Sequence, residues 1–391
     1  MSGYVRATNV VVNPNHLQYG NKSPFGFSVK IDNFDNPCPD KTKTTLLLNS
    51  ETNSTDGWKK LEFHFISFPS GSTTLNCHLG NYYGDAKGKV EFAGVTLKED
   101  ASYRKVSHSD FAAAVPVSQL VNHSVSDLAL DNWGLKLNAA TQKLKELTGM
   151  NLGVSQCFMH NNQQLDIDYN EPYACAYTGG YPPCQFSTAA SDFTMQYAPN
   201  QDAVEHGQLH EISHTYNTDL NRVWNFNDEI FTNVRATYAA VENNLKVVCA
   251  DSLESYNSPY QGMRYKQLYD SRLAEYLSNP NQYTRGYELY AMAGIYLRMV
   301  YGDSSAGLPP LGWNVFKEFF TNGIRYTPRN TMPLIPSLTY ENDFKVFNDG
   351  LDIIAQISGK RVSEIINYIP NGFYWNWYNY PSQYPFKTIK D

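Results

Sequence analysis

A short segment near the middle of the chain, His210-Glu211-Ile212-Ser213-His214, combines residue types and a spacing that suit metal binding. On an α-helix, His210 and His214 lie one turn apart on the same face, so both imidazoles can reach a single ion. Glu211 lies about 100° further round the helix, where its carboxylate can act on a bound water molecule. With 9 histidines and 38 acidic residues among 391, chance would produce roughly 0.02 such patterns. The segment therefore predicts a zinc site with His210 and His214 as ligands and Glu211 as general base.

A catalytic zinc ion usually has three protein ligands and one open position. Glu229 begins a predicted helix after His214, and the intervening residues 215–226 are long enough to bring this helix back across the first. We therefore expect Glu229 to be the third ligand. The metzincin arrangement is excluded, because Asn217 and Leu220 stand where that class needs glycine and histidine. Three other acidic residues are alternatives to Glu229: Glu242, Asp228 and Asp219.

Several polar residues around the motif are candidates for supporting roles. Asn233 lies one helical turn after Glu229 and, like Asp228, is placed to orient the ligands by hydrogen bonding. His206 lies one turn before His210, where we expect it beside the metal rather than as a ligand; the alternative is an ordinary surface histidine. A group that stabilises the developing negative charge on the substrate oxygen is also expected. Four tyrosines remain open for that role: Tyr216, Tyr238, Tyr287 and Tyr290.

The segments that must position these residues change character along the chain. The first quarter contains short apolar or alternating runs that predict strands at residues 25–31, 44–48, 61–68 and 89–97. From residue 132 the apolar spacing predicts mainly helices, at residues 132–150, 202–217, 229–243, 266–277, 287–301, 312–321, 342–357 and 362–369. Asp202 and Glu205 have the spacing of a capping pair for the motif helix. We expect an α+β chain, with a β-rich, sandwich-like unit at residues 1–125 and a mostly helical domain at residues 126–391.

The motif and the helix after it resemble a known family. The segments GQLHEISHTYN at residues 207–217 and NDEIFTNVRATYA at residues 227–239 are similar to the M60-like gluzincin metallopeptidases, which include enhancins and mucin-degrading enzymes. That family combines HExxH, a variable gap, and a glutamate followed four residues later by asparagine, which Asn233 supplies. Residues 144–150 and YNEPYACAYTGGYPP at residues 169–183 also resemble the family, and the similarity covers residues 131–370. Leu209 and Ser213 depart from it, since aromatic residues and glycine are frequent there.

The resemblance implies a zinc endopeptidase, often extracellular or at the cell surface, that acts on mucins and other O-glycosylated proteins. It implies that His210, His214 and Glu229 bind one catalytic zinc ion and that Glu211 is the general base. The domain at residues 126–391 would be the gluzincin-type metallopeptidase, and residues 1–125 an accessory or glycan-binding unit.

Composition restricts the other classes of partner. The formal charge is -7 and no long basic run occurs, which argues against a nucleic-acid partner. No stretch of about 20 apolar residues predicts a transmembrane helix, and residues 1–20 show no secretory signal. The 6 cysteines include no CxxC pair, so a cysteine-based zinc site is not expected. The aromatic run at residues 373–380 suits either glycan contact or packing.

Two alternative functions remain open from the sequence. A gluzincin exopeptidase or general peptidase would cleave proteins without requiring glycans. A carbohydrate-binding or receptor-binding protein would keep zinc only as a structural ion. Glu211 argues against the second alternative, because a structural site does not need a general base.

Overall fold

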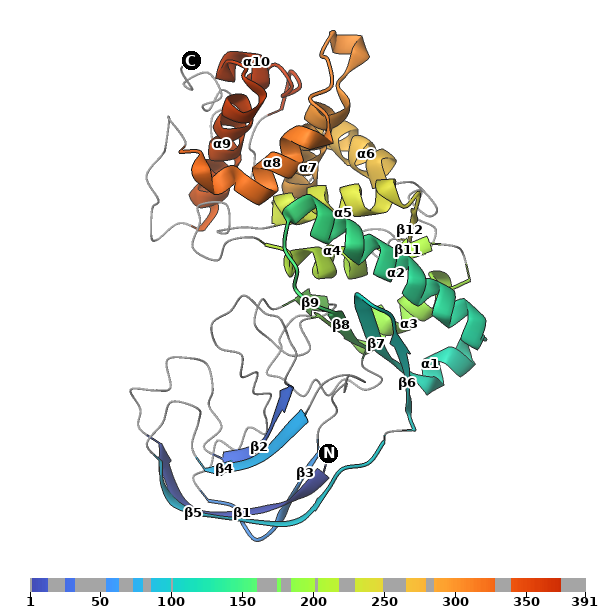
Figure 1. Ribbon diagram of the computed structural model, residues 1–391, viewed down its shortest axis with the longest axis vertical. Helices are drawn as coiled ribbons and strands as arrows, with labels where there is room; N and C mark the ends of the chain where they lie inside the picture. Colours follow the sequence, from blue (N-terminus) through green and yellow to red (C-terminus); the bar gives the residue numbers. More distant parts are fainter. Residues whose placement is uncertain are drawn as a thin grey trace. The chain divides into compact units, whose positions relative to one another are not determined.

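The computed structural model describes residues 2–12, 25–31, 54–62, 73–79, 86–99, 101–159, 174–176, 184–200, 203–217, 229–248, 265–278, 285–327 and 339–373 (Figure 1). It combines helices with several small sheets, which confirms the expected α+β class. The chain forms two compact units: unit 1 contains Met1–Gly134 and Leu152–Gln196, and unit 2 contains Leu135–Asn151 and Tyr197–Asp391. None of the described helices has the length and apolar character needed to span a membrane.

The first part of unit 1 is built from antiparallel strands. The strand β1 (Ser2–Val12) lies between β3 (Lys59–Glu62) and β5 (Ala86–Thr96), and β2 (Phe25–Ile31) pairs with β4 (Thr73–Leu79). The predicted strands at residues 25–31 and 89–97 are confirmed. Of residues 61–68, the first two belong to β3, and the rest lies outside the described residues, as does the strand predicted at 44–48.

Unit 1 contains a second, five-stranded sheet, three of whose strands lie in the mainly helical part of the chain and were not predicted from the sequence. Its order is β6 (Tyr103–Ser107), β7 (Phe111–Pro116), β8 (Ser155–Met159), β10 (Cys184–Phe186) and β9 (Ala174–Ala176). The strand β8 pairs in parallel with β7 and β10. Both β7 and β8 are buried along their whole length, so they lack the polar alternation that reveals a strand in sequence. The expected boundary at residue 125 falls inside this unit.

The helices of the second half agree closely with the sequence prediction. In unit 1 lie α1 (Val117–Asn122) and α3 (Thr188–Tyr197), and α2 (Asp127–Thr148) begins in unit 1 and ends in unit 2. Unit 2 continues with α4 (His206–His214), α5 (Glu229–Glu242), α6 (Tyr265–Ser278), α7 (Arg285–Tyr301), α8 (Trp313–Asn322), α9 (Thr339–Ser358) and α10 (Val362–Ile366). Every predicted helix is present, most with ends shifted by only a few residues.

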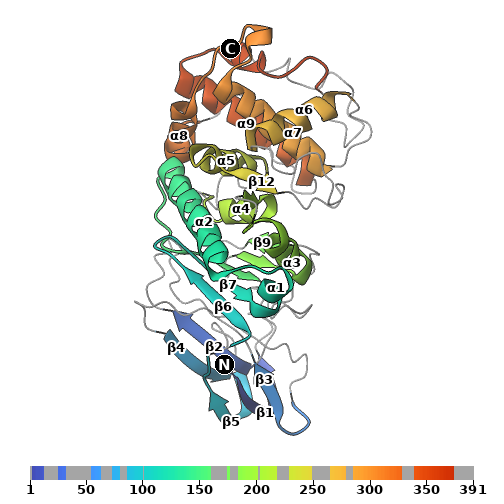
Figure 2. The ribbon, with the colours of Figure 1, turned by 90° about the vertical axis from the view of Figure 1, so that its right-hand side faces the viewer.

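The buried helix α5 is the centre of unit 2. It packs against α4, α6 and α7; in Figure 2, α4 lies below α5, and α6 and α7 lie above it and to its right. Its residues Ile230, Phe231, Val234 and Ala239 are fully buried. The Phe231 ring lies 5.3 Å from the rings of both Tyr296 and Phe319, so α5 is fixed by aromatic contacts from two other helices.

Candidate metal centre

The helix that carries the HExxH motif begins later than the sequence predicted. Residues Ala203–Glu205 form a short strand, β11, which pairs in parallel with β12 (Lys246–Val248). The Glu205 side chain then accepts hydrogen bonds from the backbone N–H groups of Gly207 (2.9 Å) and Gln208 (2.6 Å), so Glu205 itself caps α4. Asp202, the other member of the predicted capping pair, lies outside the described residues.

The helices α4 and α5 run in opposite directions across each other. β11 leads into α4 and its partner β12 follows α5, so the start of α4 and the end of α5 are held together. At the other ends, His214 lies beside Glu229 and Thr232, and His210 lies beside Asn233. His210 and His214, one turn apart on α4, thus face Asn233 and Glu229, one turn apart on α5.

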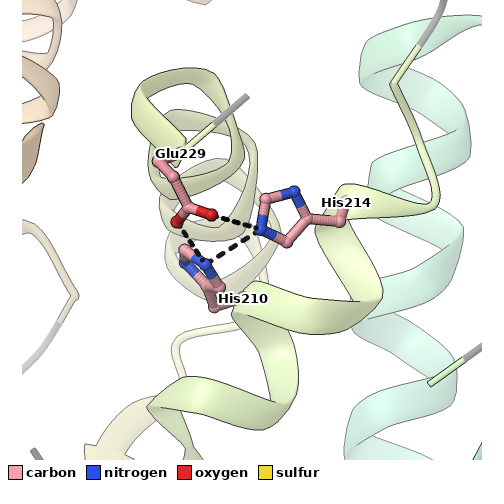
Figure 3. A group of neighbouring side chains, drawn as sticks. All are labelled: His210, His214 and Glu229. Carbon is pink, nitrogen blue, oxygen red and sulfur yellow. Dashed lines mark hydrogen bonds and ion pairs between the residues drawn. The ribbon is translucent and has the colours of Figure 1, made fainter. Parts of the chain in front are cut away.

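This crossing brings the three predicted ligands together (Figure 3). Nε2 of His210 lies 3.0 Å from Oε2 of Glu229, and Nε2 of His214 lies 3.4 Å from Oε1 of the same carboxylate. The two Nε2 atoms are 3.1 Å apart. Side-chain exposure increases from 9% for His210 and 18% for His214 to 42% for Glu229, so the cluster opens to solvent on the carboxylate side.

The separations among these donor atoms suit a zinc ion. Zinc bonds of about 2.0–2.1 Å at tetrahedral angles separate neighbouring ligand atoms by about 3.3 Å. The observed separations lie close to that value: 3.1 Å between the two Nε2 atoms, and 3.0 and 3.4 Å from these atoms to Oε2 and Oε1 of Glu229, respectively. Two imidazoles and one carboxylate are also a ligand set typical of catalytic zinc. The residues present therefore fit the metal that the sequence predicts.

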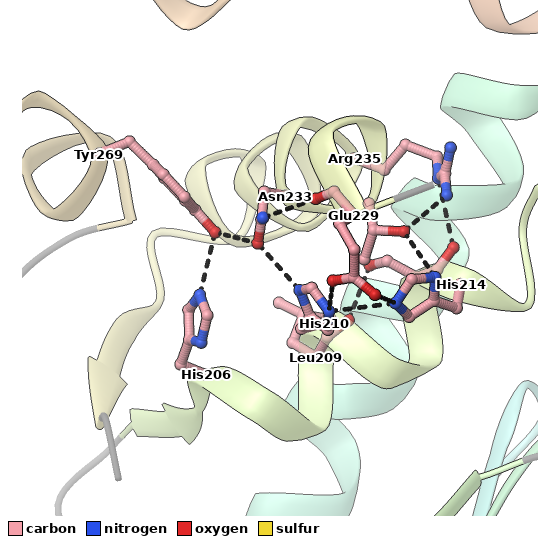
Figure 4. Close-up of polar contacts among 10 residues, drawn as sticks. His206, Leu209, His210, His214, Glu229, Asn233, Arg235 and Tyr269 are labelled. Atoms are coloured by element: carbon pink, nitrogen blue, oxygen red, sulfur yellow. Dashed lines mark hydrogen bonds and ion pairs between the residues drawn. The ribbon is translucent and has the colours of Figure 1, made fainter. Parts of the chain in front are cut away.

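The hydrogen bonds around Asn233 fix the tautomer of His210 (Figure 4). The amide Nδ2 of Asn233 donates to the backbone carbonyl of Glu229 at 2.7 Å, so the amide oxygen Oδ1 is the atom that faces His210 Nδ1 at 2.9 Å. An amide oxygen only accepts, which makes His210 Nδ1 the donor. When the ring is neutral, Nε2 carries the lone pair and faces Glu229 and His214, as a metal ligand must.

His214 has a comparable partner on α5. Its Nδ1 lies 3.0 Å from the hydroxyl oxygen of Thr232, which also accepts a hydrogen bond from Arg235 Nη2 at 2.9 Å. Arg235 is buried, and its Nε donates to the carbonyl of Ser213 at 3.2 Å, near the end of α4. Both histidines therefore have their Nδ1 atoms bonded to α5 and their Nε2 atoms turned to the same point.

Charge interactions within the cluster shift the pKa values of Glu229 and His210 in opposite directions. Burial would raise the pKa of Glu229, but the attraction and hydrogen bonds of His210 and His214 outweigh burial and hold that pKa well below its usual value. Burial lowers the pKa of His210, and here the attraction and hydrogen bond of Glu229 outweigh it and raise the pKa. Glu229 is thus an ionised carboxylate at neutral pH, the form that binds a metal ion.

The remaining predicted residues are distributed as follows. Glu211 is partly exposed on α4, and its charge acts on His210. His206 is buried with its ring 5.9 Å from that of His210, where burial lowers its pKa to about 3, so it lies beside the cluster as a neutral imidazole. Glu242 lies at the far end of α5, near Lys143. The other alternative ligands, Asp219 and Asp228, lie outside the described residues.

The four tyrosines that the sequence left open occupy different environments. Tyr238 donates a hydrogen bond to Glu146 at 3.0 Å, and Tyr216 is fully buried. Tyr290 places its ring 5.7 Å from that of His206. The Tyr287 side chain lies outside the described part of the chain.

Three residues that contact the site were not identified from the sequence: Thr232, Arg235 and Tyr269. Thr232 and Arg235 lie on α5 among helix-forming residues and carry no motif. Tyr269 lies on α6 and is one of 29 tyrosines in the chain, so composition could not single it out.

Comparisons with known proteins do not identify a family. No protein-family model and no curated protein sequence matches the chain. The chain is similar to the crystal structure of a functionally unknown conserved protein from Bacillus anthracis str. Ames, with 11% identity and a TM-score of 0.42. A mutant of a functionally unknown conserved protein from that organism gives 12% identity and 0.41. Each match covers 92% of this chain but only 66% of the other, and at these scores it supports no functional argument.

Proposed function

We propose that this protein is a zinc-dependent endopeptidase of the gluzincin type, with His210, His214 and Glu229 as zinc ligands. The observation that carries the proposal is the convergence of these three residues, with each imidazole Nε2 within 3.0 to 3.4 Å of a Glu229 oxygen and 3.1 Å from the other Nε2, beside Glu211 on helix α4. A structural zinc site is closed by four protein ligands, whereas this cluster offers three in the described part of the chain. The exposure of Glu229 leaves room for water and substrate.

The chain's own residues can supply the proton transfers of peptide hydrolysis. Bound zinc would polarise a water molecule and the scissile carbonyl group. Glu211 accepts a proton from the attacking water as its oxygen forms a bond to the carbonyl carbon. The same carboxyl group then donates that proton to the amide nitrogen as the C–N bond breaks, which releases an amine and a carboxylate. Asn233 and Thr232 hold the two imidazoles throughout.

The proposed substrates are secreted, O-glycosylated proteins of the mucin type, and the proposed location is extracellular or at the cell surface. This part rests on the resemblance of residues 131–370 to the M60-like family. The geometry of the cluster agrees with the resemblance at His210, His214, Glu229 and Asn233, which are the residues that define the family pattern. In this proposal the strands of residues 1–125 serve as an accessory unit that contacts glycans.

A Glu211→Gln variant tests the catalytic role. Glutamine keeps the size of the side chain but cannot accept the proton, so we expect zinc content to be unchanged and kcat/KM for a protein substrate to fall by about 10²- to 10⁴-fold. Metal analysis and a cleavage assay on the same preparations measure both quantities. Wild-type protein that binds zinc but cleaves no protein would favour the alternative of a binding protein with a structural ion.

One mucin substrate, used before and after enzymatic removal of its O-glycans, tests the substrate class. We expect the wild type to cleave the glycosylated form and the Glu211→Gln variant to cleave neither form. Equal cleavage of both forms by the wild type would instead establish a general peptidase without a glycan requirement.

A further inference from the structure

A continuous chain of buried hydrogen bonds leads away from the metal cluster to a third helix (Figure 4). It runs from His210 Nδ1 to Asn233 Oδ1 (2.9 Å), from Asn233 Oδ1 to the hydroxyl of Tyr269 (2.5 Å), and from that hydroxyl to Nε2 of His206 (2.9 Å). As whole residues, His206, His210, Asn233 and Tyr269 are all buried. The four residues lie on α4, α5 and α6. This series of hydrogen bonds therefore starts on α4 at His210 and ends on the same helix at His206.

The direction of every hydrogen bond in this chain follows from one backbone group. The carbonyl oxygen of Glu229 can only accept, so Asn233 Nδ2 points to it and Asn233 Oδ1 points to the other side. Oδ1 has two lone pairs, and it receives one hydrogen bond from His210 Nδ1 and one from the Tyr269 hydroxyl. Tyr269 has then used its only proton, so its oxygen accepts from His206 Nε2. In this series, every donor therefore faces an acceptor.

We propose that Tyr269, supported by His206, is a positioning residue that sets the zinc affinity of the site through Asn233. With both donors in place, rotation of the Asn233 amide would turn Nδ2 against two N–H or O–H groups and break its hydrogen bond to the Glu229 carbonyl. The Tyr269 hydroxyl therefore stabilises the amide orientation that holds His210 with Nε2 towards the metal. This inference rests on the proposed zinc site, but it does not depend on peptidase activity.

Zinc affinity of a Tyr269→Phe variant tests the proposal. Loss of an indirect partner of a ligand weakens metal binding by about 10-fold or more, so we expect the zinc dissociation constant, measured by competition with a chromophoric chelator, to rise by about 10-fold. Tyr296→Phe is the matched control, because it also removes a buried hydroxyl, which donates to the Phe347 carbonyl at 2.9 Å and does not join the chain. We expect its dissociation constant to stay within about twofold of the wild type. The visible spectrum of the cobalt-substituted protein should change for Tyr269→Phe only.

A double-mutant cycle tests whether Tyr269 acts through Asn233. If it does, adding Tyr269→Phe to Asn233→Leu causes no further loss of zinc affinity, whereas independent effects would multiply. Equal zinc affinity of Tyr269→Phe and the wild type would overturn this inference while leaving the zinc site intact. The same loss in Tyr296→Phe would also overturn it, because the effect would then follow from general destabilisation. A wild type that binds no zinc would overturn the proposed function as well.

Discussion

At the scale of single residues, each histidine of the cluster is held by a side chain on another helix. Asn233 bonds to His210 and Thr232 bonds to His214, both on the nitrogen opposite the one that faces the metal position. This arrangement sets ring orientation and leaves both Nε2 atoms for the ion. The two imidazoles in turn stabilise the charge of the Glu229 carboxylate.

The helix cap at Glu205 gives a pH-dependent prediction at the same scale. Burial raises the pKa of this carboxyl group from 4.5 to about 7, although two backbone N–H groups oppose the shift. Below pH 4.5 the group is protonated in both folded and unfolded states and has no effect on stability. As pH rises towards 7, the unfolded chain ionises first and is favoured. The stability contribution of Glu205 is therefore lost between pH 4.5 and 7.

A Glu205→Gln variant, which does not ionise, tests this account. We expect its free energy of unfolding, relative to that of the wild type, to increase by about 3 kcal/mol between pH 4.5 and pH 8, as measured by urea denaturation. A constant offset is also expected, because glutamine has one acceptor oxygen where the carboxylate uses two. A relative stability that is independent of pH would contradict the raised pKa.

At the scale of elements, the sequence predicted the helices well and the site in part. Periodic apolar residues located α5 to α10 within a few residues, and the i, i+4 spacing of His210 and His214 predicted two members of the cluster. The strands β8 and β11 were missed, because β8 is buried on both faces and β11 is only three residues long. Tyr269 was missed for another reason: its contact with Asn233 depends on how α6 packs against α5, which no local pattern records.

The packing between helices gives a prediction that opposes simple helix propensity. Gly350 lies within α9, and a Cβ atom there would meet the Tyr296 hydroxyl and lie 3.2 Å from Cζ of Phe231. Alanine favours a helix over glycine by about 1 kcal/mol, but overpacking costs about 1–3 kcal/mol. We expect Gly350→Ala to lower the free energy of unfolding in urea. Adding Tyr296→Phe should recover part of the loss, and a single variant more stable than the wild type would contradict this packing.

At the scale of the whole molecule, each of the two units is discontinuous in sequence. Residues 152–196 return to unit 1 after the chain has entered unit 2, and they bring β8, β9 and β10 to the sheet that β6 and β7 begin. The metal cluster and its supporting side chains all belong to unit 2. The boundary predicted at residue 125 therefore divides the sheet formed by β6 to β10, although it separates the first strands, β1 to β5, from most of the helices.

Two truncations distinguish these boundaries. A chain of residues 126–391 lacks β6 and β7. The strand β8 then loses its parallel partner β7, whose residues 111–114 pair with residues 155–158. It also loses Phe111, whose ring packs edge-on against Trp133 at 5.8 Å. A chain of residues 99–391 keeps both strands. We expect the longer chain to be soluble and to bind zinc, and the shorter one to aggregate on expression. Equal solubility and zinc binding of the two would contradict this assignment.

The central claim is that His210, His214 and Glu229 together form a zinc site, and metal analysis tests it most directly. Wild-type protein and the variants His210→Ala and Glu229→Ala would be loaded with zinc, dialysed and analysed for metal per chain. We predict close to one zinc ion per wild-type chain and a large loss in both variants, with folding of each checked by circular dichroism. A wild type that retains no zinc after loading, or folded variants that retain as much as the wild type, would contradict the account.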